Sequence, residues 1–186
     1  SGGVTTTVSG EAMQRAPTFV FPSAREARDF CLWLKEQFEQ IKAVAETTTS
    51  IGKLNEIEQY HAHNMVFTRF DYSTGDAAGQ NMTSRATFTA CEWIVKQYPQ
   101  LSHYLLSGSF DTEKRTSSVN LLKGRGKRVT AEITIPRDVM ISNLRISPPQ
   151  MHYGQGISTL AALLTNSSNN AAHPANGLAA LYLATG

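Results

Sequence analysis

Apolar side chains recur every three or four positions from residue 23 to residue 45, a spacing that predicts an amphipathic helix of about six turns. The helix is expected to begin at Ser23, because Ser23 and Glu26 form a capping-box pattern in which each side chain can satisfy a backbone N–H group of the other. Its apolar face is expected to consist of Ala27, Phe30, Cys31, Leu34, Phe38, Ile41 and Ala45.

Two segments alternate between apolar and polar residues with the period of two that is typical of β-strands: residues 65–72 and residues 128–135. A short strand is also expected at residues 104–106. A second helix is expected from about Asp76 to Gln97, with Met82, Ala86, Ala90, Trp93 and Ile94 on its inner face. The order helix, strand, helix, strand predicts an α/β fold of the α+β kind, with a ferredoxin-like sandwich within about residues 17–105.

The segment from Ile146 to Gly186 contains no Asp, Glu, Lys or Arg. It is too rich in Asn, Ser, Gly and His to span a membrane, so it is expected to form helices that are buried in a larger protein or at a subunit interface. Cys31 and Cys91 lack metal-ligand spacing and are expected to be reduced core residues.

Charge excludes one class of partner. Seventeen basic and fifteen acidic side chains give a formal net charge of +2, which argues against the dense basic surface that binds nucleic acid. The chain also lacks a signal peptide and an apolar run long enough to span a bilayer, so the chain by itself is expected to be soluble.

Two loops carry candidate chemistry. Gly75–Met82 places glycines and small residues where a strand turns into a helix, so that backbone amides can approach a phosphate closely. Taken alone, this segment is more typical of a tight turn that is capped by Asp76. Ser107–Arg115 sets carboxylates beside the adjacent cations Lys114 and Arg115, which could hold an anionic substrate. Taken alone, it is more typical of a solvated charged turn.

Considered together, these segments resemble the 3-hydroxy-3-methylglutaryl-CoA (HMG-CoA) reductase family in its eukaryotic-type class. Asp76–Met82 is similar to the family's Asp-Ala-Met-Gly-x-Asn-Met motif, with Ala78 at the Met position. Further counterparts, in the family's order, are Met13–Pro17, Ser107–Ser109, Glu113–Arg115, Lys123–Lys127 and His173–Asn176. The similarity extends from Gly2 to Gly186.

The resemblance implies a reductase that converts HMG-CoA to mevalonate and CoA with NADPH and that works as a homo-oligomer, a dimer or tetramer. It implies that residues 17–105 are an inserted small domain that binds the cofactor, between large-domain segments at residues 1–16 and 106–186. In the parent protein, upstream membrane helices could anchor a catalytic part that faces the cytosol.

The resemblance also assigns roles to residues of this chain. Lys114 is expected to be catalytic, because its ammonium group can stabilise an oxyanion on the thioester. The residues expected to bind the substrate are Arg15, Ser107, Glu113, Arg115 and Asn176. Those expected to bind the cofactor are Asp76, Ala78, Gly79, Asn81, Met82 and Ser50. No metal is expected, and His173 is interpreted as structural.

Several departures from the family pattern leave alternatives open. In the family an arginine binds the 2′-phosphate of the cofactor, but this chain has only uncharged residues at Thr49–Ile51. NADH therefore remains an alternative to NADPH, because a phosphate without a cationic partner loses binding energy. Lys53 is a possible substitute cation. A second lysine is missing near Gln155–Ile157, and Glu113 replaces Asp. Three further proton-transfer residues of the family fall outside the chain, which is therefore expected to be inactive by itself. The alternative is a non-catalytic homologue that acts as a binding or assembly module.

Overall fold

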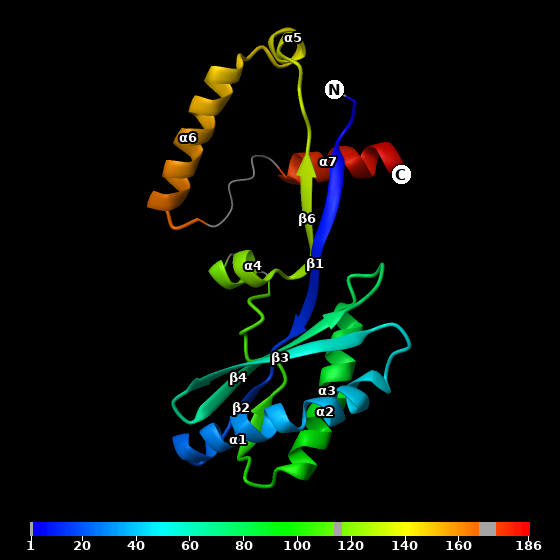
Figure 1. The fold of residues 1–186 in the computed structure, drawn as a ribbon, viewed down its shortest axis with the longest axis vertical. Coiled ribbons are helices and arrows are strands. Elements are labelled where there is room, and N and C mark those ends of the chain that lie inside the picture. Colours follow the sequence, from blue (N-terminus) through cyan, green and yellow to red (C-terminus); the bar gives the residue numbers. More distant parts are fainter. Residues whose placement is uncertain (1, 114–116, 168–173) are drawn as a thin grey trace. The chain divides into compact units, whose positions relative to one another are not determined.

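The computed structural model describes residues 2–113, 117–167 and 174–186 (Figure 1). The described residues form two compact units. A larger unit contains residues 6–113 and 119–131, and a smaller unit contains residues 2–5, 117–118, 132–167 and 174–186. The described part of the chain contains no helix that is both long and apolar enough to cross a membrane.

A six-stranded sheet forms the framework of the larger unit. Its strands are β1 (Thr5–Arg15), β2 (Thr18–Val20), β3 (Lys53–Ala62), β4 (Met65–Ser73), β5 (His103–Leu105) and β6 (Gly126–Glu132). The order is β5-β2-β4-β1-β6, and β3 also pairs with β4. β1 and β2 follow one another along β4, because Met13 lies opposite Tyr72 and Thr18 lies opposite Phe67, both in antiparallel register.

Three helices of the larger unit pack against the sheet: α1 (Ala24–Glu36), α2 (Phe38–Glu46) and α3 (Gln80–Gln97). Phe30 of α1 is fully buried, and its ring centroid lies 5.0 Å from that of Phe19 and 4.9 Å from that of Phe21. The core that α1, α2 and α3 share with the strands also contains Leu34, Ile41, Leu54, Val66, Phe70, Tyr72, Ala86, Ala90 and Ile94. The apolar faces predicted from the spacing therefore point into this core.

The segment predicted as one long helix is instead two helices, which is a correction. Ser23 does cap the first of them, because its Oγ accepts a hydrogen bond from the backbone N–H of Glu26 at 3.3 Å. The helix then changes direction at Gln37, whose φ is −91° and ψ is 7°. The two pieces keep separate buried faces, with Leu34 on α1 and Ile41 on α2. We attribute the break to the twist of the sheet. A single straight helix of about six turns would run off the twisted surface, whereas two shorter helices can each pack on it.

The second predicted helix begins four residues later than expected, at Gln80 rather than Asp76. Gly79 precedes it in the left-handed conformation, with φ 73°, and Asp76 is not its cap. The hydroxyl of Thr74 donates to the carbonyl oxygen of Ala77 at 2.6 Å and so holds the intervening residues in a turn. Small residues in a turn do not interrupt the spacing that is typical of a helix. The sequence pattern alone therefore did not show that the helix begins at Gln80.

The predicted strands are present, although their ends differ. β4 covers the expected alternation, β5 begins one residue early at His103, and β6 ends at Glu132 although the alternation continues to Ile135. The side-chain pattern identifies a strand, whereas pairing with a neighbour sets its limits. Both cysteines are free as predicted, with Cys91 buried and Cys31 half-buried.

The smaller unit is mainly helical. It contains α5 (Arg137–Val139), the π-helix η1 (Met140–Leu144), α6 (Pro148–Leu164) and α7 (Pro174–Thr185), and the short helix α4 (Ser118–Lys123) begins in it. The uncharged segment thus forms helices as predicted, but this chain does not bury them. Leu163 of α6 and Leu183 of α7 are 77% and 87% exposed.

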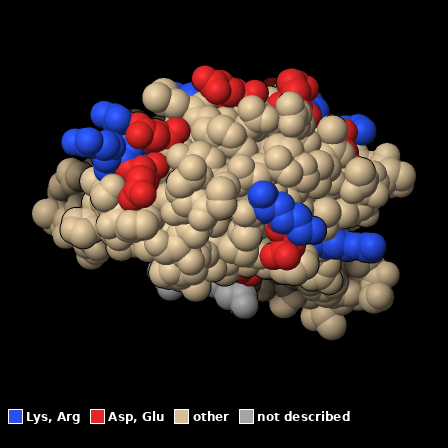
Figure 2. Space-filling view, turned by 90° about the horizontal axis from the view of Figure 1, so that it is seen from below, with Lys and Arg blue, Asp and Glu red and all other residues tan. Residues whose placement is uncertain are grey.

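Charged side chains of both signs stand near one another on the face seen in Figure 2, and wide uncharged areas separate these groups. This distribution agrees with the small net charge of the sequence.

Candidate functional site

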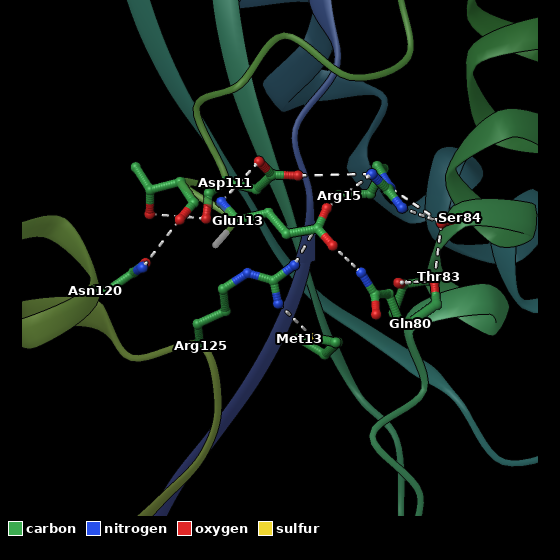
Figure 3. Close-up of polar contacts among 10 residues, drawn as sticks. Met13, Arg15, Gln80, Thr83, Ser84, Asp111, Glu113, Asn120 and Arg125 are labelled. Carbon is green, nitrogen blue, oxygen red and sulfur yellow. Dashed lines mark hydrogen bonds and ion pairs between the residues drawn. The ribbon is translucent and has the colours of Figure 1, made fainter. Parts of the chain in front are cut away.

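Arg15, at the end of β1, is the centre of a cluster of polar side chains in the larger unit (Figure 3). Its Nη1 atom lies 3.8 Å from Oδ2 of Asp111 and 3.8 Å from Oε2 of Glu113. Its Nε donates a hydrogen bond to Oγ of Ser84 on α3, at 3.0 Å. The side chain of Arg15 is only 14% exposed, so these ion pairs are less screened than surface pairs. The predicted residues Arg15 and Glu113 are therefore in contact.

The loop that follows β5 is held against the β1–β2 junction by a close backbone approach. The backbone N–H of Gly108 donates to the carbonyl oxygen of Ala16 at 2.7 Å. A Cβ at Gly108 would lie 1.8 Å from Oγ1 of Thr18, so only glycine fits this position without a shift. Two residues on, the ring of Phe110 packs against Tyr60 with centroids 4.5 Å apart. These contacts position Asp111 and Glu113 beside Arg15.

Glu113 lies between two arginines. Oε2 of Glu113 is 3.8 Å from Arg15 and 3.9 Å from Nη2 of Arg125, and the side-chain amide of Gln80 donates to Oε1 (Figure 3). Arg125 also directs Nη1 at the Met13 sulfur, 3.2 Å away. Gln80 is the first residue of α3, so this contact joins the loop after β5 to the loop that precedes α3.

The loop that precedes α3 is fastened to β1 through Glu11. Oε1 of Glu11 accepts hydrogen bonds from the backbone N–H of Thr74 at 2.7 Å and from Nζ of Lys127 at 3.1 Å. The backbone hydrogen bond from Thr74 is the main cause of a lowered pKa at Glu11; burial acts against it, and Lys127 lowers the pKa further. Lys127 also donates to the carbonyl oxygen of Gly75. The loop is thus positioned by an ionised carboxylate and a lysine.

Two glycines let the turn at residues 49–52 approach this loop. A Cβ at Gly52 would lie 2.4 Å from the sulfur of Met82, and a Cβ at Gly75 would lie 3.0 Å from Cγ2 of Ile51. Gly79 has a similar constraint, since a Cβ there would lie 2.4 Å from Cγ2 of Thr74. The predicted residue Ser50, which is exposed, therefore belongs to a turn that packs on the predicted Gly75–Met82 loop.

A cavity of about 280 Å³ opens beside the Gly75–Met82 loop. It is lined by Met13, Thr74, Asp76, Ala77, Ala78, Arg125, Gly126 and Lys127. Two of these residues are cations, and Ala78 stands immediately before the N-cap of α3. A cavity with cations and a nearby helix N-terminus has the chemistry that binds phosphate groups. The predicted residues Asp76 and Ala78 line it, while Asn81 is exposed in the first turn of α3.

The structure describes two further predicted substrate residues, which stand in separate segments. Ser107 is exposed at the start of the loop after β5, and Asn176 lies in α7, in the smaller unit. Lys114, Arg115 and His173 lie outside the described residues.

Four residues of the cluster were not singled out from the sequence: Gln80, Ser84, Asp111 and Arg125. Gln80, Asp111 and Arg125 stand within segments that were singled out as candidate loops or motifs, so their positions did carry a signal. Ser84 lies one turn beyond Gln80 on α3, and a polar residue at that spacing is common on any solvated helix face.

A second polar cluster contains three carboxylates, Glu56, Glu58 and Asp71, with oxygen atoms within 4.8 Å of one another. Cations and a phenol already surround Glu58: Nζ of Lys123 is 2.6 Å from Oε1, the Tyr60 hydroxyl donates to Oε2 at 2.8 Å, and Arg69 lies 3.9 Å away. Burial raises the pKa of Glu58, but these hydrogen bonds and charges outweigh it and leave the pKa below its ordinary value. Arg69 and Lys123 thus provide the positive charge that a metal ion would otherwise supply.

Comparison with known proteins gives a consistent result. The family described as hydroxymethylglutaryl-coenzyme A reductase matches residues 1–186. The 3-hydroxy-3-methylglutaryl-coenzyme A reductases of Pyrococcus abyssi and Methanothermobacter thermautotrophicus are 35% and 36% identical to this chain over its whole length. The chain covers 46% and 47% of these relatives, so it spans about half of their length.

A solved structure also resembles the fold. A 3-hydroxy-3-methylglutaryl-coenzyme A reductase of Streptococcus pneumoniae aligns with a TM-score of 0.48 at 16% identity, over 70% of this chain and 33% of its own.

Proposed function

Because the chain belongs to the hydroxymethylglutaryl-coenzyme A reductase family, we propose that the full-length protein reduces HMG-CoA to mevalonate and CoA with NADPH. The observation that supports this most directly is the contact between Gln80 and Glu113. It brings the loop proposed to bind the cofactor next to the loop proposed to bind the substrate, as hydride transfer between two bound molecules requires.

The proposed substrate site uses positive charge. Arg15 and Arg115 would hold the carboxylate of the hydroxymethylglutaryl group, with Ser107, Glu113 and Asn176 as further contacts. Lys114 would donate to the thioester oxygen and stabilise the oxyanion that develops there. Arginine suits the planar carboxylate and lysine suits a single oxygen, which is why we assign these roles to these side chains.

The residues of the proposed cofactor site could bind the phosphate groups of a dinucleotide. The cavity of about 280 Å³ beside Asp76 and Ala78 has Arg125 and Lys127 in its wall, and these cations could bind phosphate groups. Gly79, Asn81, Met82 and Ser50 would complete the contacts. The nicotinamide cofactor supplies hydride when bound, and the role of the chain is to bind and orient it.

The choice between NADPH and NADH depends on a cation for the 2′-phosphate. Lys53, the substitute considered from the sequence, places its Nζ 3.0 Å from Oε2 of Glu46. This pairing reduces the charge that Lys53 can offer to a phosphate. We propose NADPH on the family resemblance and keep NADH as the alternative.

The domain organisation is proposed on the order of the elements. In the larger unit, β2, α1, α2, β3, β4, α3 and β5 follow one another, with β5, β2, β4 and β3 adjacent in that order. This order supports a ferredoxin-like small domain at residues 17–105, inserted between large-domain segments at residues 1–16 and 106–186.

We also infer that the full-length protein is a homo-oligomer, a dimer or tetramer. The exposed leucines of α6 and α7, such as Leu163 and Leu183, support this inference because such surfaces are usually covered. Sedimentation velocity of the full-length protein is expected to give a dimer or a larger species. A monomer at micromolar concentration would contradict the inference.

The second candidate function is a non-catalytic homologue that acts as a binding or assembly module. Two observations favour it: Glu113 stands where the resemblance leads us to expect Asp, and no lysine occurs at Gln155–Ile157. Either change could weaken the chemical step while leaving the fold intact.

Cofactor oxidation by the full-length protein separates these two functions. We expect NADPH to be oxidised when HMG-CoA is added and not without it, with mevalonate as product, and NADH to be the comparison. The 186-residue chain alone is expected to show no turnover, because part of the proton-transfer set is absent from it. A full-length protein that binds NADPH and HMG-CoA without oxidising NADPH would instead be the non-catalytic homologue.

A further inference from the structure

One face of the sheet carries buried polar side chains. Gln14 of β1 lies opposite Asp71 of β4, and Arg69 of β4 lies opposite Glu58 of β3. Because neighbouring residues of a strand point to opposite faces, this face is opposite to the one on which Phe70 packs in the core. Gln14 and Arg69 are only 1% and 0% exposed, so their donors need hydrogen-bond partners inside the protein.

Gln14 and Arg69 share one such partner, the carbonyl oxygen of Gly124. Nε2 of Gln14 donates to this oxygen at 3.1 Å, and Nη2 of Arg69 donates to it at 3.3 Å. A carbonyl oxygen has two lone pairs and can accept both hydrogen bonds. The preceding residue is held on the same face, because Nζ of Lys123 lies 2.6 Å from Oε1 of Glu58. The loop between α4 and β6 is thus attached to the sheet by buried side chains.

Arg125 follows Gly124 and depends on this attachment for its direction. The carbonyl of Gly124 and the N–H of Arg125 belong to one planar peptide unit, so a fixed carbonyl also fixes the backbone from which the Arg125 side chain leaves. Glycines stand on both sides of Arg125, with φ of 81° at Gly124 and 78° at Gly126. Because glycine loses more conformational freedom on folding than any other residue, contacts from elsewhere must hold this loop.

The side chain of Arg125 points toward the proposed cofactor site. Its Nη1 lies 3.2 Å from the sulfur of Met13, and Arg125 lines the cavity of about 280 Å³ beside Asp76 and Ala78. Glu113 lies 3.9 Å from Nη2, which is longer than a hydrogen bond. Nε and Nη2 of Arg125 are buried and have no hydrogen-bond partner among the described residues. Arg125 therefore has unused donors for a phosphate group, provided that its backbone is held in place.

We propose that Gln14 and Arg69 are positioning residues for this cavity: by holding the carbonyl of Gly124, they direct the guanidinium of Arg125 toward a bound phosphate group. Glu58 keeps Arg69 in place, with its Oε2 3.9 Å from Nη1 of Arg69. That the phosphate belongs to a nicotinamide dinucleotide rests on the proposed function. The attachment of the loop to the sheet does not.

The first test is a double-mutant cycle on NADPH binding, measured by fluorescence titration of the full-length protein without HMG-CoA. Arg125→Gln should raise the dissociation constant about tenfold or more. Gln14→Leu keeps the size of the side chain but removes its donor, and should raise the constant about fivefold, since Arg69 still holds the carbonyl. If Gln14 acts through Arg125, the double variant should bind no more weakly than Arg125→Gln alone. Unchanged binding by Gln14→Leu, or additive losses in the double variant, would overturn the proposal.

Two further variants keep this test decisive. Arg69→Lys retains the charge beside Glu58 but lacks the second nitrogen that reaches Gly124, so it should give the same result and decides if Gln14→Leu does not fold. Thr68→Val is the matched control. It removes a buried hydrogen bond of the same sheet, from Oγ1 of Thr68 to the carbonyl oxygen of Pro17 at 2.7 Å, and should leave NADPH binding unchanged.

Hydrogen exchange of the ligand-free protein separates this inference from the proposed function. The amides of residues 124–127 should exchange about tenfold faster in Gln14→Leu than in the parent or in Thr68→Val, because the loop opens more often. Equal exchange rates would contradict the attachment. Faster exchange in a protein that does not bind NADPH would support the attachment, whereas the phosphate-binding role of Arg125 would fail together with the proposed function.

Discussion

Replacing Lys114 with alanine in the full-length protein is expected to lower the turnover number about a hundredfold or more, the usual scale for the loss of one donor to a developing oxyanion. Lys114 follows Glu113, which Arg15 and Arg125 hold at the end of the described part of the loop. The expected effect falls on the chemical step because the oxyanion forms only in the transition state. Steady-state and single-turnover rates of NADPH oxidation measure it.

Arg115→Ala is the informative partner of this variant. It should mainly raise the Michaelis constant for HMG-CoA, because a carboxylate clamp acts in both the ground state and the transition state. Lys96→Ala, at an exposed position in the last turn of α3, is the control and should leave both constants unchanged. If Lys114→Ala raised the Michaelis constant and preserved turnover, Lys114 would be a binding residue and the proposed mechanism would be wrong.

The second large effect is on the free energy of unfolding, which should change with pH because Asp71 in β4 titrates. Asp71 is 7% exposed, and burial raises its pKa from 3.8 to about 6 against the opposing charge of Arg69. Between these pH values the folded state binds more protons than the unfolded state, so stability falls as the pH rises. The contribution of Asp71 is present below about pH 4 and is lost above about pH 6, a change of about 3 kcal/mol.

Asp71→Asn isolates this contribution because the amide does not titrate. In the parent, Asp71 makes the free energy of unfolding fall between pH 4 and 6, and the variant is expected to lack this fall. The variant should therefore become more stable relative to the parent as the pH rises through this range. Urea unfolding of both proteins at several pH values measures the difference. Comparison with the parent also cancels the opposite effect of Glu58, whose pKa is lowered. Parallel curves for the two proteins would show that Asp71 ionises normally in the fold.

The sequence determined the local structure of the larger unit to a large degree. The start of α1 at Ser23, the buried faces around Phe30 and Ile41 and the alternation of β4 all follow from side-chain periodicity and capping chemistry. These are properties of neighbouring residues, so a chain pattern is sufficient to predict them. The motif resemblance that led to the family depended likewise on residues close together in sequence, and the family match over residues 1–186 confirmed it.

Only the tertiary structure decided which side chains meet. Gln80, Glu113 and Arg125 come from a helix and two loops, and their contact depends on where β1, β4 and the loop after β5 bring the backbone. The break at Gln37 also depends on what the two helices pack against. Periodicity reports which face of an element is apolar, but the distance between two elements depends on strand register and chain path, which no local pattern encodes.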